Sequence, residues 1–296
     1  MSEPFVTTKD CETTEEFLDA LSPRGDLFGA YGARRWLFRG HPDDEYELVP
    51  SALRDESKAL RQLVAGGFKT DREQTFGEMI ALARFFKASD LIGLQLPEDS
   101  QVVRRIFERT NHEKLIWPPK HLFSLMAVAQ HHGLPTRLLD WSYHPLKAAY
   151  FAASGAFEKD VRPRKLCVWA MSLWLYELPK SRALIKLVTA PSSTNPNLRA
   201  QEGVFTMMRP SRPSDLTVDR RPLNVMIEEQ IDSYSPLGRT SFFRITLPAE
   251  NAEELLFELA REGFARANLF PDFYGVVDGL KEVERISRSE FYSPSL

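Results

Sequence analysis

Apolar side chains recur three and four residues apart in several stretches of the chain, as they do along one face of a helix. This spacing predicts helices over residues 72–88, around 103–107 and over 122–129. Thr13 followed by Glu16 has the form of a capping box, so another helix is expected to begin there. The repeats are carried by Phe76, Met79, Ile80 and Ala83, by Val103, Ile106 and Phe107, and by Leu122, Leu125, Met126 and Ala129.

Glycine and proline mark where further helices are expected to begin and end. Gly133 suits the position just after the helix over 122–129. Pro145 is expected at the first position of a helix that ends near Gly155, with Leu146, Ala149, Tyr150 and Ala153 on its buried face. Asn251 with Glu254 is expected to cap a helix closed by Gly263.

Short apolar runs and alternating segments predict strands between these helices. They lie at 36–38, 138–139, 166–170, 203–207 and 243–247, with loops at 189–197 and 209–222. Intermixed strands and helices favour an α+β fold. We therefore expect an N-terminal helical segment over 1–33 and a single domain over 34–296 that carries a helical insertion at about 56–120.

The composition fits a protein with a substantial core. Of 296 residues, 43% are hydrophobic, and the formal net charge is −3, which gives no overall basic field for non-specific nucleic-acid binding. The two cysteines, Cys11 and Cys167, are far apart and form no CxxC pair, so we expect neither a disulfide nor a metal cluster. With no stretch long and apolar enough for a membrane span, the expected location is the cytoplasm.

Two segments concentrate polar side chains beside apolar runs and tight turns: 36–41 (WLFRGH) and 130–142 (QHHGLPTRLLDWS). Buried polar groups must pair with one another or with a ligand, so these segments are candidates for an anion or nucleotide pocket. Arg39 stands at a strand end beside Gly40, where a ligand can approach the backbone. Arg39 could bind a phosphate, or it could form a structural ion pair with Asp140.

The other polar residues of the second segment allow several roles. His131 and His132 are adjacent, so on a helix they point about 100° apart and are poorly placed to share one metal ion. One of them is expected to pack and the other to face the pocket. Arg137 and Asp140 point to opposite faces in an extended chain but pair in a turn. Trp141 is either a stacking platform or a core residue, and Ser142 either binds a ligand or caps the following helix.

A third group of polar residues, Gln201 and Glu202, is expected to open the strand over 203–207. Strand alternation sends one of the two side chains inward and the other outward. Glu202 is the candidate carboxylate of this pair; the alternative is an exposed glutamate at a strand end.

At these residues the chain resembles the FRG domain family, named for a Phe-Arg-Gly motif that stands here as Phe38-Arg39-Gly40. Similar patterns occur at 48–54, 130–141, 145–152, 199–205 and 269–272, so the resemblance spans roughly 34–280. A weaker resemblance links the chain to arginine-type ADP-ribosyltransferases. It implies a mixed, mostly antiparallel, split sheet and NAD as the substrate.

The resemblance to the transferases implies roles for individual residues. Arg39 would hold an NAD phosphate, Ser142 or Thr136 would support the ribose, and Glu202 would stabilise the developing oxocarbenium charge. Trp141 or a histidine would contact the nicotinamide. Two motifs differ, because Asp140-Trp141-Ser142 replaces Ser-Thr-Ser and Gln201-Glu202-Gly203 replaces Glu-x-Glu.

Three functions follow from these patterns. The first is an NAD-using ADP-ribosyltransferase-like enzyme, such as a bacterial toxin or phage-defence effector, that modifies a protein or a nucleic acid. The second is a non-catalytic module that binds a nucleotide or a partner. The third is a nuclease with a histidine as acid or base; the basic loop at 209–222 (Arg209, Arg212, Arg220, Arg221) could guide its substrate.

Overall fold

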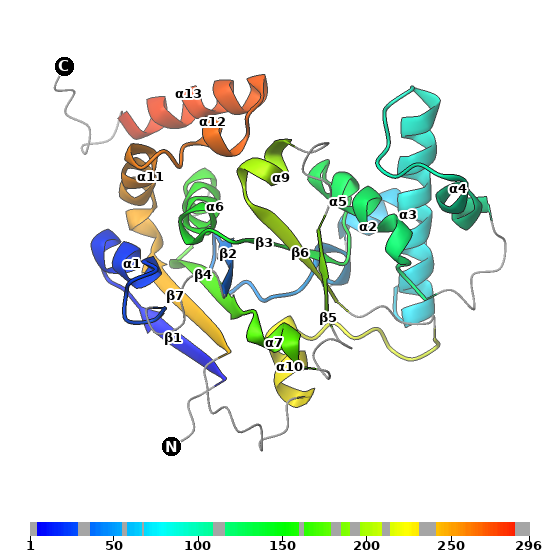
Figure 1. Cartoon of the computed structure of the whole chain (residues 1–296), viewed down its shortest axis with the longest axis horizontal. Coiled ribbons are helices and arrows are strands. Elements are labelled where there is room, and N and C mark those ends of the chain that lie inside the picture. The colour runs from blue at the N-terminus through cyan, green and yellow to red at the C-terminus, as the bar shows by residue number, and fades with distance from the viewer. Residues whose placement is uncertain are drawn as a thin grey trace.

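A computed structural model gives the fold of most of the chain as one seven-stranded sheet flanked by helices (Figure 1). Along the sheet the strand order is β1-β7-β4-β2-β3-β6-β5, with β1 and β7 parallel and every other pair antiparallel. The strands are β1 (Val6–Asp10), β2 (Trp36–His41), β3 (Leu138–Ser142), β4 (Lys165–Ser172), β5 (Ile185–Val188), β6 (Gly203–Met208) and β7 (Phe242–Pro248). The structure describes residues 5–28, 36–54, 58–66, 68–108, 116–159, 163–178, 185–189, 196–208, 214–230 and 241–287.

The sheet is nearly divided between its two central strands. β2 and β3 share one register pair, Phe38 with Ser142, whereas β2 and β4 pair over six residues. β3 and β6 pair over five, from Leu138–Met207 to Ser142–Gly203. The sheet therefore consists of a four-stranded and a three-stranded half joined at one point, which confirms the predicted mixed and split α+β fold.

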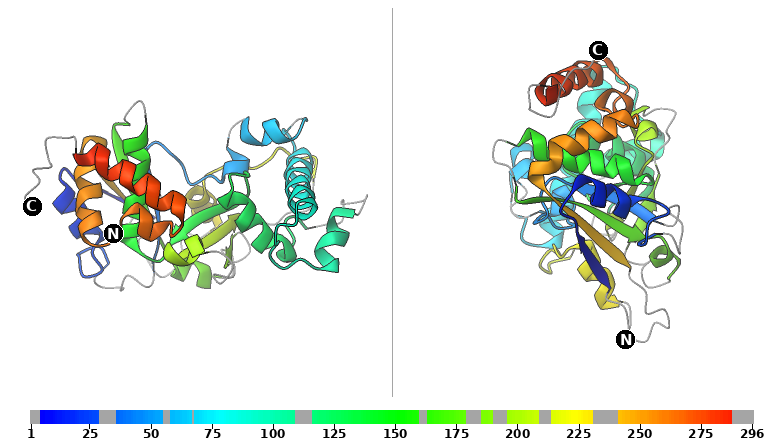
Figure 2. Two further views of the ribbon diagram at one scale, coloured as in Figure 1. Left: turned by 90° about the horizontal axis from the view of Figure 1, so that it is seen from above. Right: turned by 90° about the vertical axis from the view of Figure 1, so that its left-hand side faces the viewer.

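Helices cover both faces of the larger half of the sheet (Figures 1 and 2). On one face, α1 (Thr14–Leu21), α6 (Pro145–Glu158) and α11 (Ala252–Arg261) bury Phe17, the alanines of α6 and Leu255 against β2, β4 and β7. On the other face, α7 (Trp174–Glu177) and α10 (Leu223–Gln230) pack on Leu37 and Trp169. Removing these apolar surfaces from water is the main driving force that holds the layers together.

A second group of helices packs beside the smaller half of the sheet (Figure 2). It comprises α2 (Lys58–Leu63), α3 (Asp71–Leu91), α4 (Gln101–Glu108) and α5 (Phe123–His131). α3 and α5 share a core with Leu138 and Phe205, which belong to β3 and β6. The segment expected as a helical insertion thus contains α2, α3 and α4, and the apolar side chains of α3 and α4 are continuous with the core beside β3 and β6.

Most of the strongly patterned helices lie where the sequence predicted them. Thr13 caps α1 by accepting a hydrogen bond from the Glu16 amide, and Gly133 follows α5 with a φ of 88°. The helix expected to end near Gly155 instead continues to Glu158. Gly155 faces Pro42, so its missing side chain allows close packing and does not end the helix.

The Asn251 cap was predicted incorrectly. α11 does begin after Asn251, but that side chain makes no capping bond and donates to the Glu12 carbonyl instead. Glu254, its expected partner, accepts a hydrogen bond from the Thr14 hydroxyl, 2.7 Å away. Both polar groups therefore bind α1 to α11, because a tertiary contact competes successfully with the local cap.

Several elements were not predicted from the pattern. They include the edge strands β1 and β5 and the helices α9 (Pro196–Ala200), α12 (Arg266–Leu269) and α13 (Phe273–Ser287). The short helix expected to open at Pro50 and Ser51 is present as the 3₁₀ turn η2 (Ser51–Leu53). Cys11 and Cys167 are buried free thiols, which agrees with the expectation that they form no disulfide. Among the described helices, none combines the length and the apolar character that crossing a bilayer requires.

Candidate functional site

A cavity of about 310 Å³ lies where β2 and β3 separate. Arg39 and Gly40 reach it from β2, Asp140, Trp141 and Ser142 from β3, and Gln130 and His131 from the end of α5. Gln201 closes it just before β6. The sheet division thus brings together residues from three regions of the sequence that the sequence analysis had singled out.

Aromatic rings form much of the remaining wall. Phe151 of α6 and Phe270, which follows α12, contact each other edge to face with ring centroids 5.9 Å apart. Phe38 and Phe205 line the cavity from β2 and β6. An apolar cavity with a few convergent polar groups is the usual form of a small-molecule site.

Gly40 allows β2 to lie directly against α6. A β-carbon at this position would stand 2.0 Å from the Ala148 carbonyl oxygen and 2.7 Å from the Ala152 nitrogen. Since both are backbone atoms of a packed helix, neither can move aside cheaply. The glycine of the Phe-Arg-Gly motif is therefore required for the close packing of strand and helix that places Arg39 at the cavity.

Three contacts fix the guanidinium of Arg39. Its Nε donates to His41 Nε2 at 2.9 Å, and its Nη1 donates to the Asp140 carbonyl at 2.8 Å. The Asp140 carboxylate lies 3.4 Å from the same Nη1. The side chain of Arg39 is 14% exposed, so its charge is partly desolvated, and Arg39 is one of the residues that line the cavity.

His41 supports Arg39 as a neutral imidazole. Because a guanidinium only donates hydrogen bonds, His41 Nε2 must be the acceptor, and Nδ1 carries the proton that it donates to the Tyr46 carbonyl at 3.0 Å. Burial, together with the charge of Arg39, lowers the pKa of His41 to about 3. The histidine therefore orients Arg39 without adding a positive charge.

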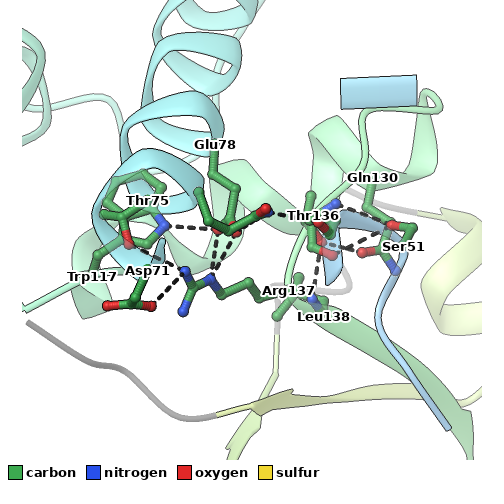
Figure 3. A network of polar contacts seen from close by, with 11 residues as sticks. Ser51, Asp71, Thr75, Glu78, Trp117, Gln130, Thr136, Arg137 and Leu138 are labelled. Carbon is green, nitrogen blue, oxygen red and sulfur yellow. Dashed lines mark hydrogen bonds and ion pairs between the residues drawn. The ribbon is translucent and has the colours of Figure 1, made fainter. Parts of the chain in front are cut away.

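Asp140 is held by a chain of polar contacts that starts on α5, and Figure 3 shows the part of this chain that joins Gln130, Thr136 and Ser51. Gln130 donates to the Asp140 carboxylate at 2.7 Å and accepts from the Thr136 hydroxyl. The Thr136 amide in turn donates to the Ser51 hydroxyl at 3.1 Å. Asp140 remains 59% exposed, so its carboxylate is positioned and still accessible. Thr136, a predicted ligand residue, lies behind Gln130 and does not line the cavity.

Arg137 points the other way, toward α3 (Figure 3). Its Nε lies 2.7 Å from Glu78 Oε2, and its Nη2 donates to the Thr75 hydroxyl at 3.2 Å. Glu78 also accepts from the Trp117 indole at 2.9 Å. Because Arg137 and Glu78 are both buried and Arg137 lies outside the cavity, Arg137 is a structural residue in this conformation.

Of the two residues before β6, only Gln201 reaches the cavity. Its side-chain amide donates to the Leu269 carbonyl, and its own carbonyl accepts from the Ser142 hydroxyl at 2.8 Å. Glu202 adopts a left-handed φ of 47° and pairs with Lys147 at 2.9 Å, outside the cavity. The strand begins only at Gly203, so the expected strand alternation does not apply to these two residues.

The two histidines differ in their contact with the cavity, although their rings lie edge to face with centroids 5.1 Å apart. His131 lines the cavity, and its Nε2 lies 3.0 Å from the Asn197 side-chain amide. Burial and the neighbouring His132 lower the pKa of His131. His132 is the C-cap residue of α5, is exposed and lies outside the cavity. No grouping of metal-ligating side chains occurs in the part of the chain that the structure describes.

Trp141 and Ser142 line the cavity and also make structural contacts. The Trp141 indole donates to the Thr206 hydroxyl at 2.8 Å, and its ring packs in the core beneath the sheet. Ser142 accepts from the His144 amide at 2.9 Å, just before α6 begins. The residues that sequence reasoning missed at the cavity are the aromatic ones, because isolated Phe residues in buried elements give no signal beyond core packing.

A divided mixed sheet with a fixed arginine at an aromatic-lined cavity describes the class of protein: an α+β domain with a cavity between its half-sheets. The family model of the FRG domain matches residues 34–161, so the chain carries an FRG domain over this range. The match includes Arg39, Gly40 and the 130–142 segment and ends before Gln201. Searches of curated proteins and of solved structures found no match.

Proposed function

We propose that the cavity binds NAD and that the protein is an ADP-ribosyltransferase-like enzyme. The observation that carries this proposal is the Arg39 guanidinium, which His41 and Asp140 hold in place at the edge of an aromatic-lined cavity. An oriented guanidinium is well suited to bind phosphate oxygens through paired hydrogen bonds. The aromatic wall provides apolar surface for a planar ring.

The size of the cavity favours one half of the dinucleotide. Pockets for small ligands range from about 300 to 1,000 Å³, and the volume of 310 Å³ lies at the lower end. This suits a nicotinamide riboside with its phosphate on Arg39. Gln201 and Ser142 line the same cavity and carry polar side chains.

In the proposed reaction the bond between ribose C1′ and the nicotinamide nitrogen breaks, and its electron pair leaves with nicotinamide. A lone pair of the acceptor then forms the new bond to C1′, and the acceptor loses one proton to solvent. Asp140 is the carboxylate at the cavity and would stabilise the positive charge that develops on the ribose. The acceptor would be a protein or nucleic-acid group, as for a bacterial toxin or phage-defence effector.

The test measures nicotinamide release and transfer of labelled ADP-ribose from NAD to purified protein and to cell lysate. Arg39→Ala should weaken NAD binding roughly 10- to 100-fold, because hydrogen bonds to charged groups contribute about 1.5–3 kcal/mol. Asp140→Asn should keep binding within a few-fold and lose turnover. Arg261→Ala, an exposed arginine on α11, is the matched control. No release of nicotinamide and no stabilisation by NAD would overturn the proposal.

A non-catalytic nucleotide-binding module is the second candidate, and the position of Glu202 favours it. In the transferase resemblance this carboxylate acts on the ribose, yet here it pairs with Lys147 and is 52% exposed. A binding module would be stabilised by NAD or a related nucleotide without releasing nicotinamide. Thermal unfolding measured beside the turnover assay therefore separates the two functions.

A further inference from the structure

A second cavity, of about 420 Å³, lies around the segment that follows β2. Tyr46, Arg54 and Arg220 line it together with Glu45 and Glu47. The Tyr46 carbonyl accepts from His41 Nδ1, and His41 Nε2 accepts from Arg39. A single imidazole thus connects Arg39 at the first cavity to Tyr46 at the second.

The backbone that carries Arg54 is fixed relative to the first cavity. Arg220 Nη1 donates to the carbonyls of Leu53 and Arg54, at 3.0 Å each. The Ala52 amide donates to the Thr136 carbonyl at 3.1 Å, which ties this turn to the segment that leads into β3. Arg54 therefore holds a defined position beside the residues that position Asp140.

Arg54 and Arg220 form no ion pair with a carboxylate in the part of the chain that the structure describes. The Nε of Arg54 donates to the Val49 carbonyl at 3.2 Å, and within the described residues neither arginine has a carboxylate in ion-pair range. Partial burial and repulsion by Arg39 lower the pKa of Arg54. Two neighbouring guanidinium groups are stabilised when an anion binds between them.

The rest of the second cavity suits a nucleoside. Tyr46 is 42% exposed, and the Lys159 ammonium lies over one face of its ring, 4.5 Å from the centre. A base would therefore stack on the other face. Stacking on an aromatic ring is the common way in which proteins bind bases. The carboxylates of Glu45 and Glu47 accept hydrogen bonds, as ribose hydroxyl groups require.

We propose that the ligand is a dinucleotide that occupies both cavities, with its diphosphate between Arg39 and Arg54 and its adenosine half against Tyr46. The inference rests on the proposed function and adds the binding mode of the second half of the substrate. It accounts for a first cavity with room for only one half. It also gives Arg54, which has no carboxylate in ion-pair range among the described residues, an anionic partner.

Isothermal titration of the full chain with nicotinamide mononucleotide, ADP-ribose and NAD tests this arrangement. NAD should bind at least 10-fold more tightly than the mononucleotide. Tyr46→Ala should weaken NAD binding about 5- to 100-fold, the range for loss of one stacked base, and leave mononucleotide affinity unchanged. Tyr143→Ala is the matched control, since Tyr143 is 40% exposed and lines neither cavity.

The charge is tested separately with Arg54→Ala and Arg54→Lys. Both should weaken NAD and ADP-ribose, the lysine variant less, and circular dichroism confirms that each variant is folded. If the mononucleotide binds and NAD binds no more tightly, or if Tyr46→Ala and Arg54→Ala bind NAD as wild type does, the dinucleotide arrangement is wrong and the proposed function stands. If neither ligand binds the wild-type protein, the proposed function fails as well.

Discussion

The segment 137–140 contributes to two arginine–carboxylate pairs, Arg137 with Glu78 and Arg39 with Asp140. The two pairs differ in burial, in distance and in the number of further hydrogen bonds. In the pair of Arg137 with Glu78, the side chains are 4% and 3% exposed, and each makes further hydrogen bonds. In the pair of Arg39 with Asp140, they are 14% and 59% exposed, and the closest ion-pair distance is 3.4 Å. The first pair is buried from solvent, whereas the residues of the second pair line a cavity.

The comparison shows that residue type does not decide the role of an arginine. A desolvated and fully bonded pair has no capacity left for a ligand, and separating it leaves a buried charge without a partner. A partly solvated pair contributes little to stability and can exchange one partner for another. Arg137 therefore holds α3 against β3, while Arg39 is available to bind an anion.

The largest effect is expected from removing the buried charge on α3. Glu78→Gln removes the closest carboxylate from the buried Arg137 and leaves it only Asp71, 3.7 Å away, so the unfolding free energy should fall by up to about 3–5 kcal/mol. Urea denaturation followed by circular dichroism measures this change. Asp140→Asn, its counterpart at the cavity, should cost less than about 1 kcal/mol. Equal losses in the two variants would show that the pairs do not differ as described.

The glycines beside the two pairs should differ in the same measurement. A β-carbon on Gly40 meets backbone atoms of α6, so Gly40→Ala should cost about 1–3 kcal/mol. A β-carbon on Gly77, next to Glu78, meets the tip of the Phe68 ring, which can move. Because alanine also favours a helix interior, Gly77→Ala should stay within about 1 kcal/mol of wild type. A larger loss for Gly77→Ala would contradict this view of the strand–helix contact.

Acid titration should reveal the neutral histidine beside Arg39. The folded pKa of His41, about 3, lies below the ordinary value of 6.5, so its contribution to stability is complete above pH 6.5. As pH falls toward 3, the unfolded chain binds a proton that the folded chain excludes, and the free energy of unfolding drops by up to about 1.4 kcal/mol per pH unit. His131 and His144, whose pKa values burial also lowers, act in the same direction.

Unfolding curves of the wild type and His41→Gln between pH 7 and 4 isolate the contribution of His41 to the pH dependence of stability. The variant should lose stability less steeply as the pH falls, whereas His121→Gln, at an exposed position, should follow the wild type. A variant with the wild-type slope would mean that His41 is not the titrating group.

The smallest effect on stability is expected at Arg39 itself. Arg39→Ala should change the unfolding free energy by no more than about 1 kcal/mol, because water can enter the cavity and solvate the groups that it leaves. Thermal unfolding without ligand checks this value. A loss as large as that of Glu78→Gln would place Arg39 with the structural residues.

The strongest local patterns were sufficient to predict much of the fold. Gly133 and Pro145 marked helix ends correctly because their backbone preferences act locally. β1 escaped prediction because it is an edge strand with the polar sequence VTTKD and pairs only with β7. Its position depends on a partner more than 230 residues away, which no local pattern encodes.

For the candidate site, too, local patterns predicted some residues, whereas contacts between distant residues could not be predicted. Arg39 and Asp140 stood out because charged residues flanked apolar runs, and the fold places both at one cavity. The partner of Arg137 could not be found, since Glu78 lies 59 residues away on a helix whose apolar pattern gives no role to an acidic residue. The direction of Glu202 depends on a left-handed backbone angle that strand alternation does not anticipate.

The single register pair between β2 and β3 has a consequence for ligand affinity. Where the two strands part, the Asp140 carbonyl has the Arg39 guanidinium as its hydrogen-bond donor in place of a strand amide. An anion that takes the same Nη1 group competes directly with the main chain of β3. The affinity for the anion would then include the free energy needed to give the Asp140 carbonyl a new hydrogen-bond donor. Anion binding at the cavity would therefore be coupled to the hydrogen bonding of the sheet.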